Sequence, residues 1–486
     1  MAQAFDSQGI NIILLFLVLT FIYLILKQLK KSYHPSLPPG PTPWPILGNL
    51  HQLKSMSHIT LANLAQSYGP LMLLRLGTQI LIVGSSPSAA IEILKTNDRI
   101  LSARPVPHSV PLTKSQIKQM SFWADPLSDH WKNIRTSCRT ELFSSKSLES
   151  QANLRERKIM EMVEFLRLNE GIDVNVHQIV FATVLNMFSN VLFSKDVVGL
   201  DEELGCNKVR GFLRGIIEAI SAPNLSDFYP LILGKFDVQG LRKKHREMSM
   251  KMCALWETIV EERRKMGKDG LRDQDFLDTL IYKGFTDDQI NKLFEELFQA
   301  GIDTTTSTIN RTMIELLNNP ESMTKLKKEL VSKLNQHFCK ESDLEALPYL
   351  QACVKETLRL HPPAPLLLSH RALETCQVMN YTVPKNARVL VNVWAIARDP
   401  TVWKDPLEYR PERFLESTLD FKGNDFEFLP FGAGRRICPG LPMAAKIVPL
   451  VVASLIHFHD WSLPEGNAYE TLEMVQPLLL TPTARK

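Results

Sequence analysis

Most of the chain carries apolar residues at the three- and four-residue spacing of a helix that buries one face. We predict helices over six segments: Leu154–Arg167, Val176–Phe193, Lys244–Lys265, Asp287–Leu317, Leu350–Leu360 and Leu441–His457. Strand-like alternation is confined to short pieces: Leu71–Val83, turning at Gly77-Thr78, and the segments Val378–Val383 and Val389–Val393. The polar stretch Met266–Asp275 is expected to be a surface loop. The pattern predicts a mainly helical fold with a minor sheet in one large domain.

The apolar run Ile10–Leu26 is predicted to be a transmembrane helix. As a helix it would reach about 25 Å, enough for a thin membrane such as the endoplasmic reticulum. A cleaved signal peptide is the alternative, but no Lys or Arg precedes the run and no small-residue cleavage site follows it. Lys27, Lys30 and Lys31 follow at once, which predicts a lumenal segment 1–9 and a cytoplasmic remainder.

Prolines dominate Leu37–Pro45, and at this density they exclude a helix and favour a stiff, extended segment. We therefore expect residues 27–48 to be a basic stop followed by a proline-rich hinge. Beyond Gly48 the chain has no second linker and no internal repeat, so residues 49–486 are expected to form one large domain.

Composition narrows the classes of function. The 486 residues are 44% hydrophobic and 22% charged, as in ordinary globular proteins. The net charge is only +4 and no Lys/Arg tract could follow a phosphate backbone, which argues against a nucleic-acid partner. Seven widely spaced cysteines without a Cys-x-x-Cys pair argue against disulfides and structural zinc, and favour a reducing compartment.

One cysteine stands in an unusual setting. Cys438 lies between a glycine-rich segment that begins at Phe431 and an apolar helix that begins near Leu441. A helix N-terminus and the neighbouring Arg435 and Arg436 would favour the thiolate, which is one of the ligands that hold heme iron. A buried structural cysteine is the alternative. Zinc is disfavoured because no second Cys or His is near in sequence.

His457 and His459 form the only close histidine pair, and we expect them to be structural because two ligands make an incomplete metal site.

The cysteine segment carries a family resemblance. Its residues fit Phe-x-x-Gly-x-Arg-x-Cys-x-Gly at every fixed position, namely Phe431, Gly434, Arg436, Cys438 and Gly440. The chain thereby resembles, along essentially its whole length, the plant microsomal cytochrome P-450 family of heme-thiolate monooxygenases. The resemblance implies the cytochrome P-450 fold, heme b as cofactor, Cys438 as the iron ligand, and the other four residues as parts of the heme-binding loop.

A narrower resemblance concerns three further segments: Asp98–Arg104, Cys138–Phe143 and Arg371–Cys376. They are similar to alkaloid-oxidising plant members of the family, a group that includes N-methylcoclaurine 3'-hydroxylase, corytuberine synthase and littorine mutase. These members catalyse hydroxylation, phenol coupling or rearrangement of their substrates. The shared motifs do not tell which of the three reactions a given member catalyses.

Glu356 and Arg359 are three residues apart on a predicted helix, where they can pair. Alone they would be a surface ion pair of little energetic weight. The resemblance implies instead that they are buried, joined by Arg413, and serve a structural role in fixing the cysteine loop.

The segment Ala300–Thr305 interrupts a long helical pattern, because Gly301 and three consecutive threonines are poor helix formers. A bent core helix is one interpretation. The resemblance implies a catalytic one, in which Thr304 and Asp303 form the relay that delivers protons when O2 is split.

Heme carboxylates need cationic and N–H partners. Trp131 and Arg135 lie four residues apart, on one face of a helix. The resemblance implies that both residues bind the heme carboxylates, together with Arg436 and His370. Arg371 is the alternate to His370.

Electrons must come from a partner, since no dinucleotide fingerprint or phosphate-binding loop is present. The resemblance names this partner as the NADPH–cytochrome reductase. Lys132 and Arg139 could form a basic docking patch for an acidic domain, or simply a solvated helix face.

Substrate contacts are expected from the loop Arg104–Ser121 and, by family position, from Ala300, Ala364 and Leu368. The predicted function is oxidation of a plant alkaloid with O2 at the endoplasmic reticulum membrane.

Two alternatives stay open: a reductase-independent isomerase, and a heme-binding but catalytically impaired copy. Three departures from the family pattern count against a simple carry-over, and the last of them motivates the impaired copy. The departures are Asn310-Arg311 in place of Glu-Trp, Ser369 in place of Pro, and a stretch at Leu472–Leu478 that is about ten residues short of a usual strand and turn.

Overall fold

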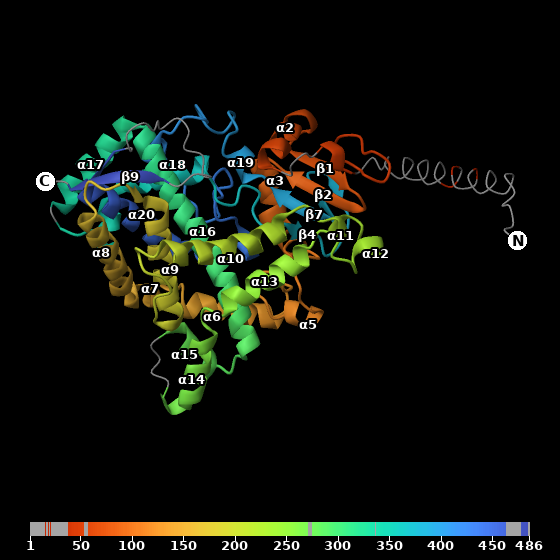
Figure 1. Ribbon diagram of the computed structural model, residues 1–486. Coiled ribbons are helices and arrows are strands. Elements are labelled where there is room, and N and C mark those ends of the chain that lie inside the picture. The colour runs from red at the N-terminus through yellow and green to blue at the C-terminus, as the bar shows by residue number, and fades with distance from the viewer. Residues whose placement is uncertain are drawn as a thin grey trace, which may run out of the picture.

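A computed structural model describes residues 37–484 except 53–56, 271–274, 336 and 463–477, together with Leu15, Val18 and Thr20. Most of the predicted anchor 10–26, and all of segment 1–9, lie outside these residues. Figure 1 shows the sheet that contains β1 and β2 at the end of the molecule nearest the N-terminus, and most helices gathered beyond it. The fold is mainly helical with small sheets, as predicted.

The helices follow in chain order. Up to the middle of the chain they are α2 (His58–Tyr68), α3 (Pro87–Ile91), α4 (Asp98–Leu101), α5 (Lys114–Ile117), α6 (Asp129–Glu141), α7 (Ser145–Ser150), α8 (Ala152–Leu168), α9 (Val176–Phe193), α10 (Glu203–Ser221), α11 (Leu225–Phe228) and α12 (Pro230–Leu233). Then come α13 (Leu241–Cys253), α14 (Glu257–Gly270), α15 (Phe276–Tyr282), α16 (Asp287–Asn318), α17 (Pro320–Leu334), α18 (Pro348–Leu360), α19 (Val393–Ile396) and α20 (Leu441–Phe458). Five single-turn or tight helices are η1 (Leu50–Gln52), η2 (Glu92–Thr96), η3 (Glu341–Ala346), η4 (Pro411–Phe414) and η5 (Gly434–Arg436).

The largest sheet has four strands in the order β1-β2-β7-β4. Its strands are β1 (Leu71–Leu76), β2 (Gln79–Gly84), β7 (Arg388–Val391) and β4 (His370–Arg371). The predicted hairpin is confirmed, because β1 and β2 pair antiparallel with Leu76 opposite Gln79. By contrast β2 and β7 pair in parallel, with Leu81 opposite Arg388. The sheet therefore joins two distant parts of the sequence.

Two smaller sheets complete the β-structure. One has the order β3-β9-β8, formed by β3 (Val174–Asn175), β9 (Leu479–Ala484) and β8 (His459–Ser462), and the other pairs β5 (Cys376–Val378) with β6 (Tyr381–Val383). The predicted segment Val378–Val383 is thus the tip of a hairpin, whose turn residues Met379 and Asn380 both have positive φ.

Two predicted elements were wrong in their bounds. The segment Lys244–Lys265 is not one helix, because the chain breaks between α13 and α14 at Ala254–Trp256. Trp256 is fully buried there, stacks on Phe298 and donates from Nε1 to Asn291 Oδ1 at 2.9 Å. The expected loop Met266–Asp275 is helical up to Gly270, where α14 ends.

The core lies around α9 and α16. Helix α16 starts at a capping box, in which the Thr286 hydroxyl accepts from Gln289 N and the Gln289 side chain accepts from Thr286 N. Helices α9 and α20 are apolar enough to cross a membrane, but 89% and 67% of their residues are buried inside the protein. Both are therefore core helices, which position the site residues on α16 and at the start of α20.

Candidate active site

The cysteine loop is held by unusual backbone geometry. Gly432 and Gly434 have φ of 70° and 67°, the left-handed region that favours glycine. A Cβ on Gly434 would lie 2.2 Å from Leu94 O, so no larger residue fits there. Cys438 N donates to Phe431 O at 3.0 Å and closes the loop just before α20. Both glycines are thus required by the backbone conformation, and Gly434 also by its close approach to η2.

The surroundings of the thiol differ in part from expectation. Arg435 does not face Cys438, because its guanidinium forms an ion pair with Asp98 at 2.9 Å. Burial raises the pKa of the Cys438 thiol, while the N–H groups of Gly440 and Leu441 and the charge of Arg135 oppose this rise. Arg135 is therefore the cation that favours the thiolate, and the two N–H groups point donors at the sulfur.

A cluster of cations lies beside this loop. Arg436 donates to the carbonyl oxygens of Ser102 at 2.8 Å, Ser121 at 3.1 Å and Ala124 at 2.7 Å. Arg135 donates to the carbonyl of Ile437. Between the two guanidinium groups lies Trp131, with Arg436 5.0 Å and Arg135 5.8 Å from its ring centroid. The indole N–H donates to Ser121 O at 3.0 Å.

Sequence reasoning missed Arg104 as a member of this cluster. Its guanidinium is buried, donates to Leu368 O and, at 2.9 Å, to Ser369 O, and keeps Nε without a partner. Burial and the charges of Arg436 and Arg135 lower the pKa of Arg104. A lone arginine in a loop has no partner at helical or strand spacing, so the sequence gives no local signal for its role.

His370, and not Arg371, lies with the cluster. His370 is buried, its Nδ1 is 2.7 Å from Leu101 O, and burial together with Arg104 lowers its pKa. The guanidinium of Arg371 binds Asn386 Oδ1 at 3.0 Å and reaches only the backbone carbonyl of Arg104, at 3.4 Å. Neighbouring residues of a strand point to opposite faces, and this separates the two.

The donor set fits the carboxylates of a heme. In the described part of the chain, Arg104, Arg135 and Arg436 form no direct ion pair with a carboxylate. Burial is the main cause that lowers the pKa of each of these guanidinium groups. Arg104 is buried and Arg135 and Arg436 are half-buried, and guanidinium groups in such places without a directly bound anion are costly. Two carboxylates from a cofactor would relieve that cost. Cys438 on the same loop supplies the thiolate that heme iron accepts.

The predicted catalytic pair lies on α16. This helix is continuous through Ala300–Thr305. The Thr304 hydroxyl donates to Ala300 O at 2.5 Å, and both residues are exposed, one turn apart on a mostly buried helix. Burial raises the pKa of the neighbouring Asp303, and Arg210 and Arg214 on α10 oppose this.

Gly301 has a packing role that the sequence did not reveal. A Cβ at this position would lie 2.3 Å from Cε1 of Phe188 on α9, so only glycine lets the two helices approach this closely.

The structure brings the three residues of the predicted structural network together. Glu356 and Arg359 are fully buried, and Arg413 is 8% exposed. Glu356 accepts from Arg359 Nε at 2.8 Å and NH2 at 2.9 Å, and from Arg413 Nε at 2.9 Å. The Arg410 backbone N–H adds a fourth donor at 2.8 Å. The carboxylate is therefore saturated with charge-assisted hydrogen bonds.

An aromatic chain connects this network to the cysteine loop. Trp403 lies under both arginines, with Arg359 5.2 Å and Arg413 5.9 Å from its ring centroid. From there successive ring contacts, each 5.0–6.4 Å between centroids, run through Phe414, Phe428, Phe421 and Phe431. Phe431 belongs to the cysteine loop, so the buried ion network and the loop share one packed core.

The predicted substrate residues lie on two segments. Ala300 is exposed on α16, while Ala364 and Leu368 follow α18, with Leu368 51% exposed. The departure at Ser369 makes a polar contact, because its hydroxyl accepts from Arg388 Nε at 2.8 Å. At the other described departure, Asn310 Nδ2 lies 2.9 Å from His177 Nδ1. The shortened stretch Leu472–Leu478 lies outside the described residues except for Leu478.

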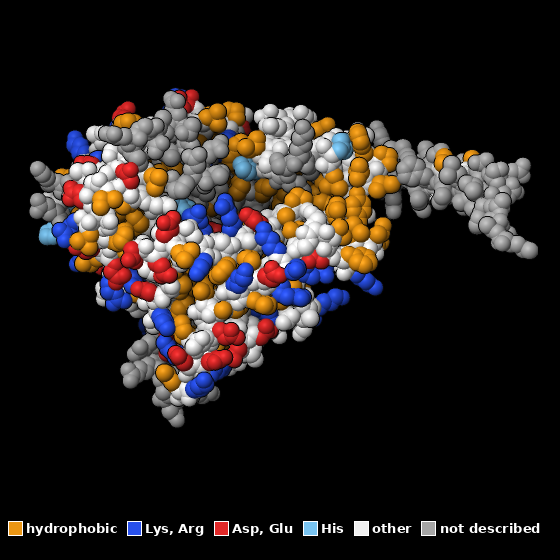
Figure 2. Space-filling model, in the orientation of Figure 1, with side chains coloured by type: hydrophobic (Ala, Val, Ile, Leu, Met, Phe, Trp, Pro, Cys, Tyr) orange, Lys and Arg blue, Asp and Glu red, His pale blue; other side chains and the backbone are white. Residues whose placement is uncertain are grey.

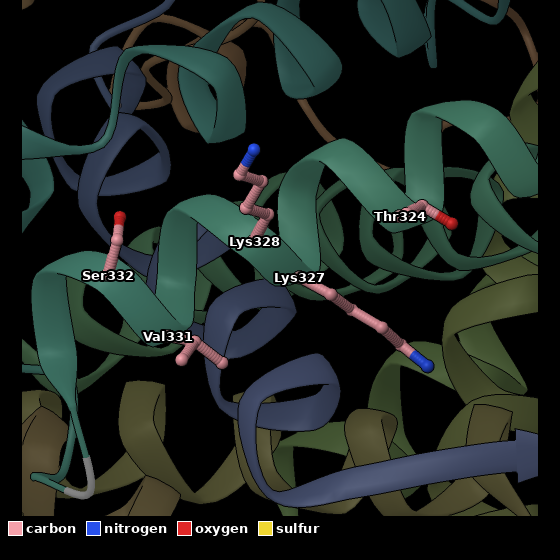
Figure 3. A pocket seen from close by; sticks show the side chains of 5 residues that line it. All are labelled: Thr324, Lys327, Lys328, Val331 and Ser332. Carbon is pink, nitrogen blue, oxygen red and sulfur yellow. The ribbon is translucent and has the colours of Figure 1, made fainter.

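Figure 3 shows a surface pocket that is unrelated to these residues. It is lined by one face of α17, namely Thr324, Lys327, Lys328, Val331 and Ser332. Lys327 pairs with Asp460. No group of three or more His, Cys, Asp or Glu side chains that could hold a metal occurs within the described ranges.

Comparison with known proteins agrees with this geometry. Residues 38–486 match the cytochrome P450 family. The chain belongs to that family, whose members bind heme iron through a cysteine thiolate and act as monooxygenases with O2 and a redox partner.

Individual members of the family are similar to this chain over nearly its whole length. The chain is 46% identical to (S)-N-methylcoclaurine 3'-hydroxylase isozyme 1 of Eschscholzia californica, over 93% of this chain and 95% of the relative. It is also 46% identical to corytuberine synthase of Coptis japonica, over 96% of each chain. Similarity to geraniol 8-hydroxylase of Swertia mussotii is 38% identity, over 98% of this chain and 97% of the relative.

Proposed function

We propose that this cytochrome P450 monooxygenase oxidises a plant alkaloid at the endoplasmic reticulum membrane, with electrons from NADPH–cytochrome reductase. The observation that carries the oxidation chemistry is Cys438, placed on a glycine-shaped loop with N–H donors at its sulfur and with one buried and two half-buried arginines nearby. Heme, when bound there, supplies the iron that activates O2.

In this mechanism the chain's own residues hold the cofactor and move protons. Arg104, Arg135, Arg436, Trp131 and His370 are the donors for the heme carboxylates, and Cys438 is the iron ligand. The Thr304 hydroxyl, exposed on α16, can turn from Ala300 O to donate a proton toward the reacting oxygen.

Asp303 can replace the proton that Thr304 gives up, because burial raises the pKa of its carboxyl and so helps it to hold one.

The proposed substrate class follows from the relatives. Two of them, at 46% identity, are named for the plant alkaloids N-methylcoclaurine and corytuberine, whereas the relative named for geraniol is less similar. Hydroxylation and phenol coupling are therefore the favoured reactions. Ala300, Ala364 and Leu368 are proposed substrate contacts, since small and apolar side chains suit a polycyclic skeleton.

Association with a membrane is supported by an apolar surface beside the sheet that contains β1 and β2. Figure 2 shows apolar side chains gathered over the region of β1, β2, α11 and α12. Its exposed members include Trp44, Ile46, Leu47, Leu231, Ile232, Phe236 and Val238, with Leu231 98% exposed. Exposed apolar patches of this kind mark contact surfaces. A single-pass anchor over residues 10–26 would hold this surface at the bilayer.

Reductase docking is proposed at α6. Arg139 is exposed near the end of this helix, while Lys132 is exposed and pairs with Asp129 at 2.9 Å. The helix also carries Arg135, which reaches the cysteine loop. An acidic partner bound here would lie close to the thiolate side of the site.

The two alternatives are less well supported. A reductase-independent isomerase would not need the Asp303–Thr304 pair, and two of the relatives above are named hydroxylases. An impaired copy was suggested by the short stretch at Leu472–Leu478, yet the chain covers 95–97% of the three relatives.

The test is expression of the full chain in microsomes with and without a plant reductase, followed by mass spectrometry of products. Benzylisoquinoline and tropane alkaloids are the test substrates, and geraniol is the control. We expect an oxidised alkaloid that requires both NADPH and the reductase. Product formed without NADPH would favour the isomerase, and turnover of geraniol alone would contradict the substrate class.

A further inference from the structure

Glu296 is a buried carboxylate on α16 that the chemistry proposed above does not use. It is 3% exposed and lies two turns before Thr304. Its Oε2 accepts from the backbone N–H of Ser121 at 2.8 Å, and its Oε1 accepts from the N–H of Phe122 at 2.7 Å. Both oxygens therefore bind consecutive N–H groups of one loop, a two-point contact that fixes orientation as well as distance.

The same two peptide groups bind the heme-side cations through their carbonyl oxygens. Ser121 O accepts from Trp131 Nε1 at 3.0 Å and from Arg436 at 3.1 Å, and Phe122 O accepts from Arg436 at 3.3 Å. The segment from Ser121 to Phe122 thus lies between a carboxylate on one side and cationic donors on the other. Its position depends on both.

The carboxyl group of Glu296 lies in a setting that disfavours its negative charge. Burial raises the pKa of Glu296 to about 8, and Glu295 adds to the rise, while the two N–H groups and Arg436 oppose it. A carboxylate in such a setting is tolerated only where its hydrogen bonds are satisfied. The adjacent Glu295 has other partners, since it accepts from Ser249 Oγ at 2.5 Å and from Gln299 Nε2 at 3.0 Å.

We propose that Glu296 is a positioning residue, which clamps the segment Ser121–Phe122 to α16 and so fixes one wall of the substrate pocket relative to the heme edge. The clamp itself rests on the hydrogen bonds above, and its link to substrate rests on the proposed function, in which the loop up to Ser121 contributes to the pocket. Glu296 does not touch the reacting atoms.

Both tests use the heme-loaded full chain at about pH 9, above the pKa of Glu296, where the group is a carboxylate and both of its oxygens accept. The first test measures the clamp directly. Amide hydrogen exchange is followed by mass spectrometry in peptides that cover Ser121 and Phe122. In Glu296→Gln one acceptor becomes an NH2 donor that opposes a backbone N–H, so exchange there should be about tenfold faster or more. Glu296→Asp, which keeps both acceptor oxygens, should restore part of the protection. Glu295→Gln removes a neighbouring carboxylate and should leave these amides unchanged.

The second test asks whether the clamp sets the pocket wall. Imidazole and 4-phenylimidazole bind heme iron and differ in size, so the ratio of their dissociation constants, measured from the visible spectrum, reports the room beside the heme. Glu296→Gln should change this ratio about threefold or more. The estimate takes the lower end of the energy of a hydrogen bond to a charged group and divides it between the two N–H contacts. Glu295→Gln should not.

Two results would overturn the proposal: wild-type exchange in folded Glu296→Gln, or an unchanged ratio of the two azole affinities. If Glu296→Gln does not bind heme, hydrogen exchange in the wild-type protein tests the proposal by itself. Unprotected amides at Ser121 and Phe122 would show that no clamp exists. None of these measurements needs turnover, so failure of the clamp is distinguishable from failure of the proposed function.

Discussion

Replacing Glu356 by Gln is expected to lower the stability of the whole domain. The substitution keeps the shape of the side chain but removes the charge that four donors share, from Arg359, Arg413 and the Arg410 backbone. Two arginine side chains would then be buried without a counter-charge. The amide also turns one acceptor into a donor, which faces an N–H at 2.8–2.9 Å.

The size of the loss can be worked out from the geometry. Removing one partner of a buried ion pair costs about 3–5 kcal/mol. Here the arginines keep other acceptors, since Arg359 also donates to Ala397 O at 2.7 Å and Pro406 O at 2.8 Å, and Arg413 to Lys404 O at 2.8 Å. The lower end, about 3 kcal/mol, is therefore expected. With an unfolding entropy of roughly 1 kcal/mol/K for a chain of this length, the melting temperature should fall by about 3 °C.

The assay is thermal unfolding of the heme-loaded protein, followed by circular dichroism. Glu164→Gln is the matched control, because its partner Arg167 lies at 2.7 Å but both side chains are more than half exposed. Solvent screens such a pair, and no shift in melting temperature is expected. The reasoning is refuted if Glu356→Gln melts with the wild type, or if Glu164→Gln loses as much.

Four further predictions concern the site. Cys438→Ser should abolish the thiolate-type spectrum of the reduced, carbon-monoxide-bound protein, and a retained spectrum would contradict the ligand assignment. Thr304→Ala should retain heme but release peroxide and uncouple NADPH use from product, whereas unchanged coupling would remove this hydroxyl from the relay. Gly434→Ala places a Cβ 2.2 Å from Leu94 O at a φ of 67°, so heme content after purification should drop sharply, while a fully loaded variant would show that the loop can shift.

The pKa of Glu296, about 8 against an ordinary 4.5, means that the folded chain retains a proton that the unfolded chain loses as pH rises from about 5 to 8. Wild-type stability should therefore fall through that window relative to Glu296→Gln, by up to about 1.4 kcal/mol per pH unit, and parallel melting curves at pH 6 and 8 would contradict this.

Local patterns predicted much of the fold. The bounds of α9 agree with the predicted Val176–Phe193, and α16 ends one residue beyond the prediction, because periodicity and caps are written in neighbouring residues. The break at Ala254–Trp256 was missed because apolar spacing continues through it. What ends α13 there is burial of Trp256 against α16, a contact between segments far apart in sequence.

The same distinction applies to the site. Residues within one motif, such as those around Cys438, could be proposed from the family resemblance that the motif carries. Arg104 and Glu296 could not, because their partners are backbone groups of distant loops: the carbonyls of Leu368 and Ser369 for one, the N–H groups of Ser121 and Phe122 for the other. Backbone acceptors and donors leave no trace in side-chain identity, so only the fold shows them.

The parallel pairing of β2 with β7 has a consequence for synthesis of the chain. Leu81–Gly84 gains its partner only when residues 388–391 have been made, about 300 residues later. At a translation rate of about 5–20 residues per second the ribosome needs roughly 15–60 s for that interval. For this time an apolar strand edge stays open while the nascent chain grows, and such edges invite wrong partners. The period just before β7 emerges is therefore when a chaperone has most to protect.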